Sequence, residues 1–110
     1  MNKLEEAIIA GTNAARQHVK DNPEGANWYP CGFAWLTYKC RKNAKEAAIL
    51  LQAGFRWDDY SKLYTFSGGS FSNTQSMNYK TEILRAFTAA SNPILLAAGI
   101  NGFGIHDRID

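Results

Sequence analysis

The chain has 110 residues, of which 45% are hydrophobic, and this length allows one domain around a single core while excluding a second. Its net charge of +2 is too small for the strongly basic face of a protein that holds nucleic acid by charge alone. No apolar run has membrane-spanning length, and residues 1–6 lack the apolar part of a signal peptide. We therefore expect a single cytoplasmic domain over residues 1–110 with no membrane partner.

The two cysteines, Cys31 and Cys40, lie at the ends of a segment that we predict to be extended. Nine extended residues at about 3.3 Å each separate them by roughly 30 Å, which is too far for a disulfide. The Cys and His spacings do not resemble a zinc framework either. We expect two reduced thiols, no metal and no cofactor.

Residues 4–19 carry apolar or small side chains at intervals of three and four, which is the pattern of one helix face. The members of this stripe are Leu4, Ile8, Gly11, Ala15 and Val19. Small residues in the stripe allow another element to approach closely. We therefore predict an N-terminal helix within residues 1–20 that packs on the core and is broken by residues 21–25.

Residues 31–40 are rich in aromatic and β-branched side chains and predict a strand. Alternation places Phe33, Trp35 and Thr37 on one face of this strand. The opposite face then carries Ala34, Leu36 and Tyr38. Because both faces are apolar, we expect a central strand that is covered on both sides.

A second helix is predicted from Asn43, which has the capping-box spacing to Glu46, up to the stop at Gly54. Residues 55–57 and 63–66 flank a polar segment and predict a hairpin.

A polar loop over residues 68–76 follows the hairpin and leads into a third helix, which begins near Ser76 and runs to about Ala90. Asn92 and Pro93 are expected to end this helix, with a possible further short turn over residues 94–96. Residues 102–109 alternate well enough for a last strand.

After the N-terminal helix, the predicted order is strand, helix, strand, strand, helix, strand. This is the split βαβ pattern, so we predict an α+β fold: a ferredoxin-like βαββαβ antiparallel sheet with an additional N-terminal helix. Right-handed crossovers place the second hairpin strand next to the aromatic strand and the last strand on its other side.

In that topology the loop over residues 68–76 meets the end of the last strand at one pole of the sheet. Unpaired N–H groups at a helix start favour an anion, and a guanidinium beside them would hold a phosphate or carboxylate. The alternative is a surface loop whose Ser or Asn side chain only caps the helix. The predicted ligand-binding residues are Ser70, Ser72, Asn73, Thr74, Ser76, His106 and Arg108.

The opposite pole carries a basic turn after the aromatic strand, which supports a second hypothesis, a nucleic-acid-binding module. Its predicted residues are Trp35, Lys39, Arg41, Lys42 and Lys45. RNA-recognition domains share the βαββαβ order and stack bases on sheet aromatics, for which Phe33, Trp35, Tyr64 and Phe66 are the candidates here. The competing interpretation is that these aromatics are core residues or are covered by the first helix or a second subunit.

Catalysis has one candidate arrangement, a nucleophile and base formed by Cys31 with His106 and Asp107. The residues around Cys31 contain nothing that specifically activates its thiol. We therefore expect a protein that is not an enzyme.

Three segments together, Tyr29 to Trp35, Gln75 to Met77 and Arg108 to Asp110, resemble small uncharacterised proteins encoded by bacteriophages and prophages. The resemblance implies a compact accessory protein of the host cytoplasm, in a class where binding, inhibition of host defence and sequestration of small signals outnumber catalysis. The resulting expectation is a non-enzymatic, homo-oligomeric binding protein that engages a host protein or an anionic ligand such as a nucleotide.

Overall fold

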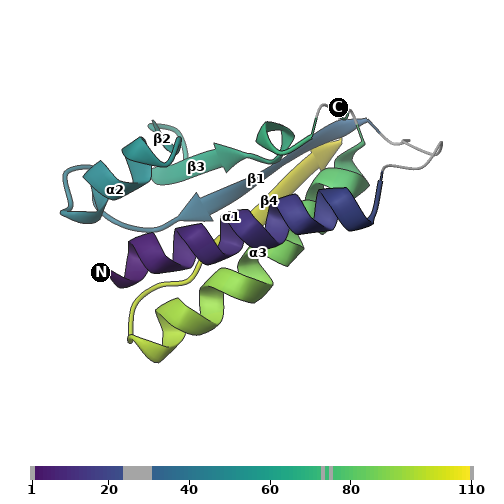
Figure 1. Ribbon diagram of the computed structural model, residues 1–110. Helices are drawn as coiled ribbons and strands as arrows, with labels where there is room; N and C mark the ends of the chain where they lie inside the picture. The colour runs from purple at the N-terminus through teal and green to yellow at the C-terminus, as the bar shows by residue number, and fades with distance from the viewer. Residues whose placement is uncertain (1, 24–30, 73, 75, 110) are drawn as a thin grey trace.

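The computed structural model describes residues 2–23, 31–72, 74 and 76–109, and it has the mixed α+β architecture that the sequence predicts (Figure 1). An N-terminal helix is present, and the strands form one four-stranded antiparallel sheet. The elements in chain order are α1 (Lys3–Asp21), β1 (Gly32–Tyr38), α2 (Glu46–Gln52), β2 (Arg56–Asp58), β3 (Leu63–Ser67), the 3₁₀ turn η1 (Gly68–Ser70), α3 (Met77–Ala97) and β4 (Gly104–Ile109).

The sheet has the strand order β2-β3-β1-β4, so β1 is an inner strand with β3 on one side and β4 on the other. Trp35 marks the register, because it lies opposite Ser67 of β3 and His106 of β4. This register determines which side chains from three strands share a face.

Helices α1 and α3 form a layer on one face of the sheet (Figure 1). Helix α3 packs against β1 and β4, while α1 packs chiefly along α3. The close approach of the two helices depends on Gly11, because a Cβ atom at that position would lie 2.7 Å from the ring of Phe87 in α3. The small residues of the α1 stripe therefore serve the contact with α3.

Burial follows the alternation predicted for β1 from Phe33 to Leu36 but not at Thr37, which is 6% exposed although alternation places it on the Phe33 face. Ala34, Leu36 and Tyr38 are buried in the core below the sheet, whereas Phe33 on the other face is 47% exposed and Trp35 is half-buried. The expectation that both faces are covered is therefore wrong for the single chain. Its physical reason is the placement of α1, which joins α3 on the core side and leaves the Phe33 side open.

Helix α2 begins at Glu46 without the predicted capping box. Its N-cap residue is Lys45, which makes no side-chain capping hydrogen bond. The preceding residues instead form turns in which the Ala44 N–H donates to the Arg41 carbonyl and the Ala47 N–H to the Ala44 carbonyl, each at 3.0 Å. These local backbone bonds make a side-chain cap unnecessary at this helix start.

Helix α3 continues through Pro93 to Ala97, so the predicted stop at residues 92 and 93 is wrong. Two contacts hold the last turns: Leu95 is fully buried, and the Asn92 amide exchanges hydrogen bonds of 2.8 and 3.0 Å with the backbone of Phe103. Tertiary packing thus outweighs the cost of a proline within the helix.

No disulfide joins Cys31 and Cys40. Burial of the Cys40 thiol, and to a smaller extent the nearby charge of Glu46, raises the pKa of Cys40. Within the part of the chain that the structure describes, no helix combines the length and apolarity needed to cross a bilayer.

Candidate binding site on the open sheet face

The open face of the sheet carries a row of aromatic and cationic side chains. Phe33 lies opposite Arg108, and Trp35, two residues further along β1, lies between His106 of β4 and Ser67 of β3. Residues directly opposite in antiparallel strands share a face and have Cβ atoms about 5 Å apart. The register alone therefore brings these five side chains together.

The rings and cations in this row contact one another. The Trp35 and His106 rings stack with centroids 5.9 Å apart and planes inclined by 18°. The guanidinium carbon of Arg108 lies 5.7 Å from the centroid of the Phe33 ring. Both contacts leave ring surface and charge available at the solvent side, because Phe33, His106 and Arg108 are all exposed.

A second cation reaches Phe33 from α3. Strand β3 pairs with β1 only as far as Ser67, and Gly32 lies beyond the last paired residue of β1. The Gly32 carbonyl oxygen instead accepts a 2.8 Å hydrogen bond from Lys80 Nζ. The same Nζ lies 5.5 Å from the Phe33 ring centroid, and Lys80 is only 9% exposed. Lys80 thus fixes the end of β1 that carries Phe33.

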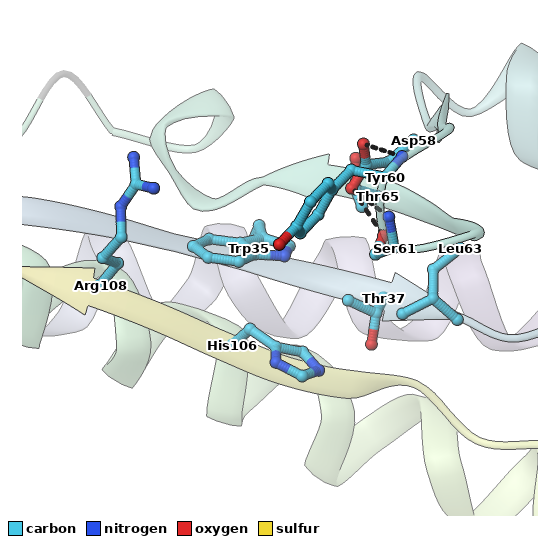
Figure 2. A pocket seen from close by; sticks show the side chains of 9 residues that line it. All are labelled: Trp35, Thr37, Asp58, Tyr60, Ser61, Leu63, Thr65, His106 and Arg108. Carbon is cyan, nitrogen blue, oxygen red and sulfur yellow. Dashed lines mark hydrogen bonds between the residues drawn. The ribbon is translucent and has the colours of Figure 1, made fainter.

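The open face is hollowed in two adjoining places. The first hollow, of about 450 Å³, is lined by the nine side chains that Figure 2 labels, which come from all four strands and from the loop between β2 and β3. The second, of about 310 Å³, extends toward Phe33 and Ser67. Trp35, Thr65 and Arg108 line both, so the two hollows form one trough along β1.

Tyr60 forms a wall of the first hollow and is 97% exposed (Figure 2). The turn that presents it is organised by Asp58, whose carboxylate accepts hydrogen bonds from the Ser61 hydroxyl at 2.6 Å and from the Tyr60 N–H at 3.2 Å. These hydrogen bonds lower the pKa of Asp58, and the bond from the Ser61 hydroxyl has the largest effect. The turn therefore presents an exposed aromatic side chain at the hollow that Trp35 also lines.

The ligand-binding residues predicted from the sequence do not all lie together in the structure. His106 and Arg108 line the trough. Thr74 and Ser76 are buried, and their hydroxyls accept hydrogen bonds of 3.0 and 3.2 Å from the N–H groups of Ser76 and Tyr79. The capping alternative is therefore confirmed for Ser76, which is the N-cap of α3.

Among the described residues, Ser70 and Ser72 do not line the trough. Ser70 is exposed in η1 and Ser72 is half-buried after it. Asn73 lies outside the described residues, as do Tyr29, Gln75 and Asp110 of the segments that carry the phage resemblance.

The basic turn between β1 and α2 is exposed at Lys39, Arg41, Lys42 and Lys45. It is anchored from below, because the Tyr64 hydroxyl donates a hydrogen bond to the backbone carbonyl of Lys42. Tyr64 is buried and Phe66 packs on Phe55 and Phe71. Of the four aromatics compared with RNA-recognition domains, only Phe33 and Trp35 therefore face outward.

The predicted nucleophile and base are not brought together. His106 lies opposite Trp35, four residues along β1 from Cys31, which is about 13 Å at 3.3 Å per residue. Among the residues that the structure describes, no group of three or more His, Cys, Asp or Glu side chains could hold a metal ion. The trough is lined chiefly by aromatic rings and hydroxyls, with Arg108 and the Asp58 carboxylate.

Sequence reasoning missed Tyr60 and Lys80. A tyrosine within the polar hairpin segment was a visible signal for Tyr60, since an aromatic there has no core to enter. Lys80 has no such signal, because its role depends on where β3 leaves β1.

Comparison of the chain with protein-family models, curated proteins and solved structures finds no match.

Proposed function

We propose that this protein is a non-enzymatic binding module whose open sheet face binds an anionic ligand with a planar ring, such as a nucleotide. One observation carries the proposal: Phe33 and Trp35 stand outward on β1 opposite Arg108 and His106 of β4, over a trough with hollows of about 450 and 310 Å³. Hollows of this size fall in the range of small-molecule sites.

Each part of the trough matches one part of such a ligand. A base stacked on an aromatic side chain contributes about 1–3 kcal/mol, and this contribution tolerates any base because every base has a π face. The Arg108 guanidinium offers a planar fork of donors to phosphate oxygens. Thr65 lines both hollows and offers a hydroxyl to ring edges.

The test is calorimetric titration with nucleoside monophosphates and their uncharged nucleosides, using wild type, Trp35→Leu and Arg108→Gln. Trp35→Leu should lower the affinity for nucleosides and for nucleotides alike by about 5- to 150-fold. Arg108→Gln should weaken only the phosphorylated forms. Lys20→Gln is the matched control, because it removes one exposed positive charge from α1. Equal binding by wild type and Trp35→Leu would contradict the proposal.

For the architecture, the strand order β2-β3-β1-β4 and the antiparallel pairings support the proposal of a ferredoxin-like βαββαβ core with an additional N-terminal helix. A phage accessory role, a host-protein partner and a homo-oligomeric state stay predictions from the sequence.

A further inference from the structure

We propose that the trough binds single-stranded nucleic acid through at least two consecutive nucleotides, with one base held between Trp35 and Tyr60 and the next on Phe33. This inference rests on the proposed function and narrows it, because a mononucleotide would occupy only one of the two positions. Three features of the open face carry it: the spacing of the two β1 aromatics, the wall opposite Trp35, and the distribution of charge.

The spacing of Phe33 and Trp35 selects an unstacked strand. Residues two apart on one face of a strand are separated by about 6.6 Å. Consecutive bases along one strand of a duplex are separated by about 3.4 Å, so a duplex cannot place neighbouring bases on both rings. An extended single strand whose bases are splayed apart can. Single-stranded segments are also the form in which bases become available for stacking on aromatic side chains.

The two positions differ in what covers the bound base. At Trp35 the hollow has Tyr60 as a second aromatic wall, and the hydrogen bonds of Asp58 hold the turn that carries it (Figure 2). A base there is sandwiched between two rings. At Phe33 the second hollow offers one ring face with its cations and the neighbouring Ser67, so the next base stacks on one side only.

The charges lie where a nucleic-acid backbone would run. Arg108 lines both hollows, which places its guanidinium beside the linkage between the two bases. At the other end of the trough β1 continues into the exposed basic turn that begins at Lys39. The one carboxylate in the lining, Asp58, accepts hydrogen bonds within its own turn. The positive charge of this face therefore lies at Arg108 and at the basic turn, and phosphodiesters supply negative charge to these two places without bulk.

The experiment is a calorimetric length series at low salt with thymidine monophosphate, pdT2, dT8, the matching uridine series and a duplex octamer. In wild type we expect the dinucleotide to bind about 5- to 150-fold more tightly than the monophosphate, which is the effect of one more stacked base. Binding of dT8 should weaken with salt, with a logarithmic slope of about −0.7 for each phosphate neutralised. The two series separate DNA from RNA as the source of the same chemistry.

Two variants assign the positions. Phe33→Leu should remove the gain in affinity that wild type shows from the monophosphate to the dinucleotide. Tyr60→Ala should weaken the monophosphate and the dinucleotide by the same factor, and folding is not at risk because Tyr60 is 97% exposed. Leu96→Ala, an exposed apolar truncation on α3, is the matched control and should change none of these affinities.

The outcomes separate this inference from the proposed function. Monophosphate and dinucleotide bound equally by wild type, a length gain that survives in Phe33→Leu, or equal binding of the duplex would each overturn the two-base inference alone. Failure of every nucleotide to bind would overturn both. A dimer that Phe33→Leu dissociates, with no nucleic acid bound, would assign the open face to a second copy and overturn both as well.

Discussion

Replacing Lys80 with methionine tests how α3 holds the open sheet face in place. The Lys80 ammonium is buried between α3 and the end of β1, where it donates to the Gly32 carbonyl at 2.8 Å and lies 5.5 Å from the Phe33 ring centroid. Methionine keeps most of the aliphatic stem but removes the charge and the donor. Gly32 then retains a carbonyl oxygen without its lysine donor.

The expected magnitude follows from opposing terms. A hydrogen bond from a charged group contributes about 1.5–3 kcal/mol, and the cation–π contact adds roughly 0.5–1 kcal/mol. Against these stands the cost of removing an ammonium from water, which methionine no longer bears. Because the Lys80 bond is charge-assisted and the ammonium also faces an aromatic ring, we expect a net loss of about 1–2 kcal/mol in the free energy of unfolding.

Urea unfolding followed by circular dichroism measures this change, and the melting temperature should fall by about 4 °C per kcal/mol for a domain of this size. Lys20→Met is the matched control, because Lys20 is exposed on α1, and it should shift stability by no more than about 0.5 kcal/mol. If Lys80→Met is as stable as wild type, desolvation of the ammonium cancels its contacts, and Lys80 does not stabilise the Phe33 end of β1.

Two further predictions concern the fold and the loop. Gly11→Ala gains about 1 kcal/mol of helix propensity but places a Cβ atom 2.7 Å from the buried Phe87 ring, so it should lower the free energy of unfolding. The control Asn13→Ala, on the exposed face of α1, should raise the free energy of unfolding slightly. A stabilised Gly11→Ala variant would refute the tight helix contact. Because the pKa of Asp58 is lowered on folding, the stabilisation that Asp58 gives the hairpin turn should be complete above its unfolded pKa near 3.8 and should disappear as the pH falls through the lower folded pKa. Carboxyl NMR titration should show the Asp58 pKa moving back toward 3.8 in Ser61→Ala. An unchanged pKa would exclude the Ser61 hydroxyl as the main cause of the shift.

The faces of β1 could be predicted from the sequence, but the covered face could not. Alternation separates Phe33 and Trp35 from Ala34 and Leu36 whatever lies above or below the sheet. Helix α3 buries one face, and whether the other face is covered as well depends on where α1 packs. Gly11 indicates a close contact but not its partner, and the partner is the Phe87 ring on the core side.

Helix ends show the same division between local and tertiary causes. Ser76 caps α3 as a local rule predicts, because its hydroxyl reaches the N–H of Tyr79 within the same turn. The continuation of α3 past Pro93 could not be predicted, since it depends on the Asn92 amide binding the backbone of Phe103. The local pattern around Pro93 does not predict the helix end because the contact that extends α3 comes from Phe103, eleven residues after Asn92.

The composition of the open face distinguishes a binding surface from a sheet face that is merely solvated. A face that needs only to contact water carries polar side chains, as β3 does at Thr65 and Ser67. The inner strand β1 instead places Phe33 and Trp35 at the centre of that face, with Arg108 beside them. Aromatic side chains at the centre with polar and charged groups around them are the pattern of an interface. Outward rings of this size cost solvation free energy in the free protein, and this cost, with Arg108 beside the rings, supports the proposal of an anionic partner that covers them.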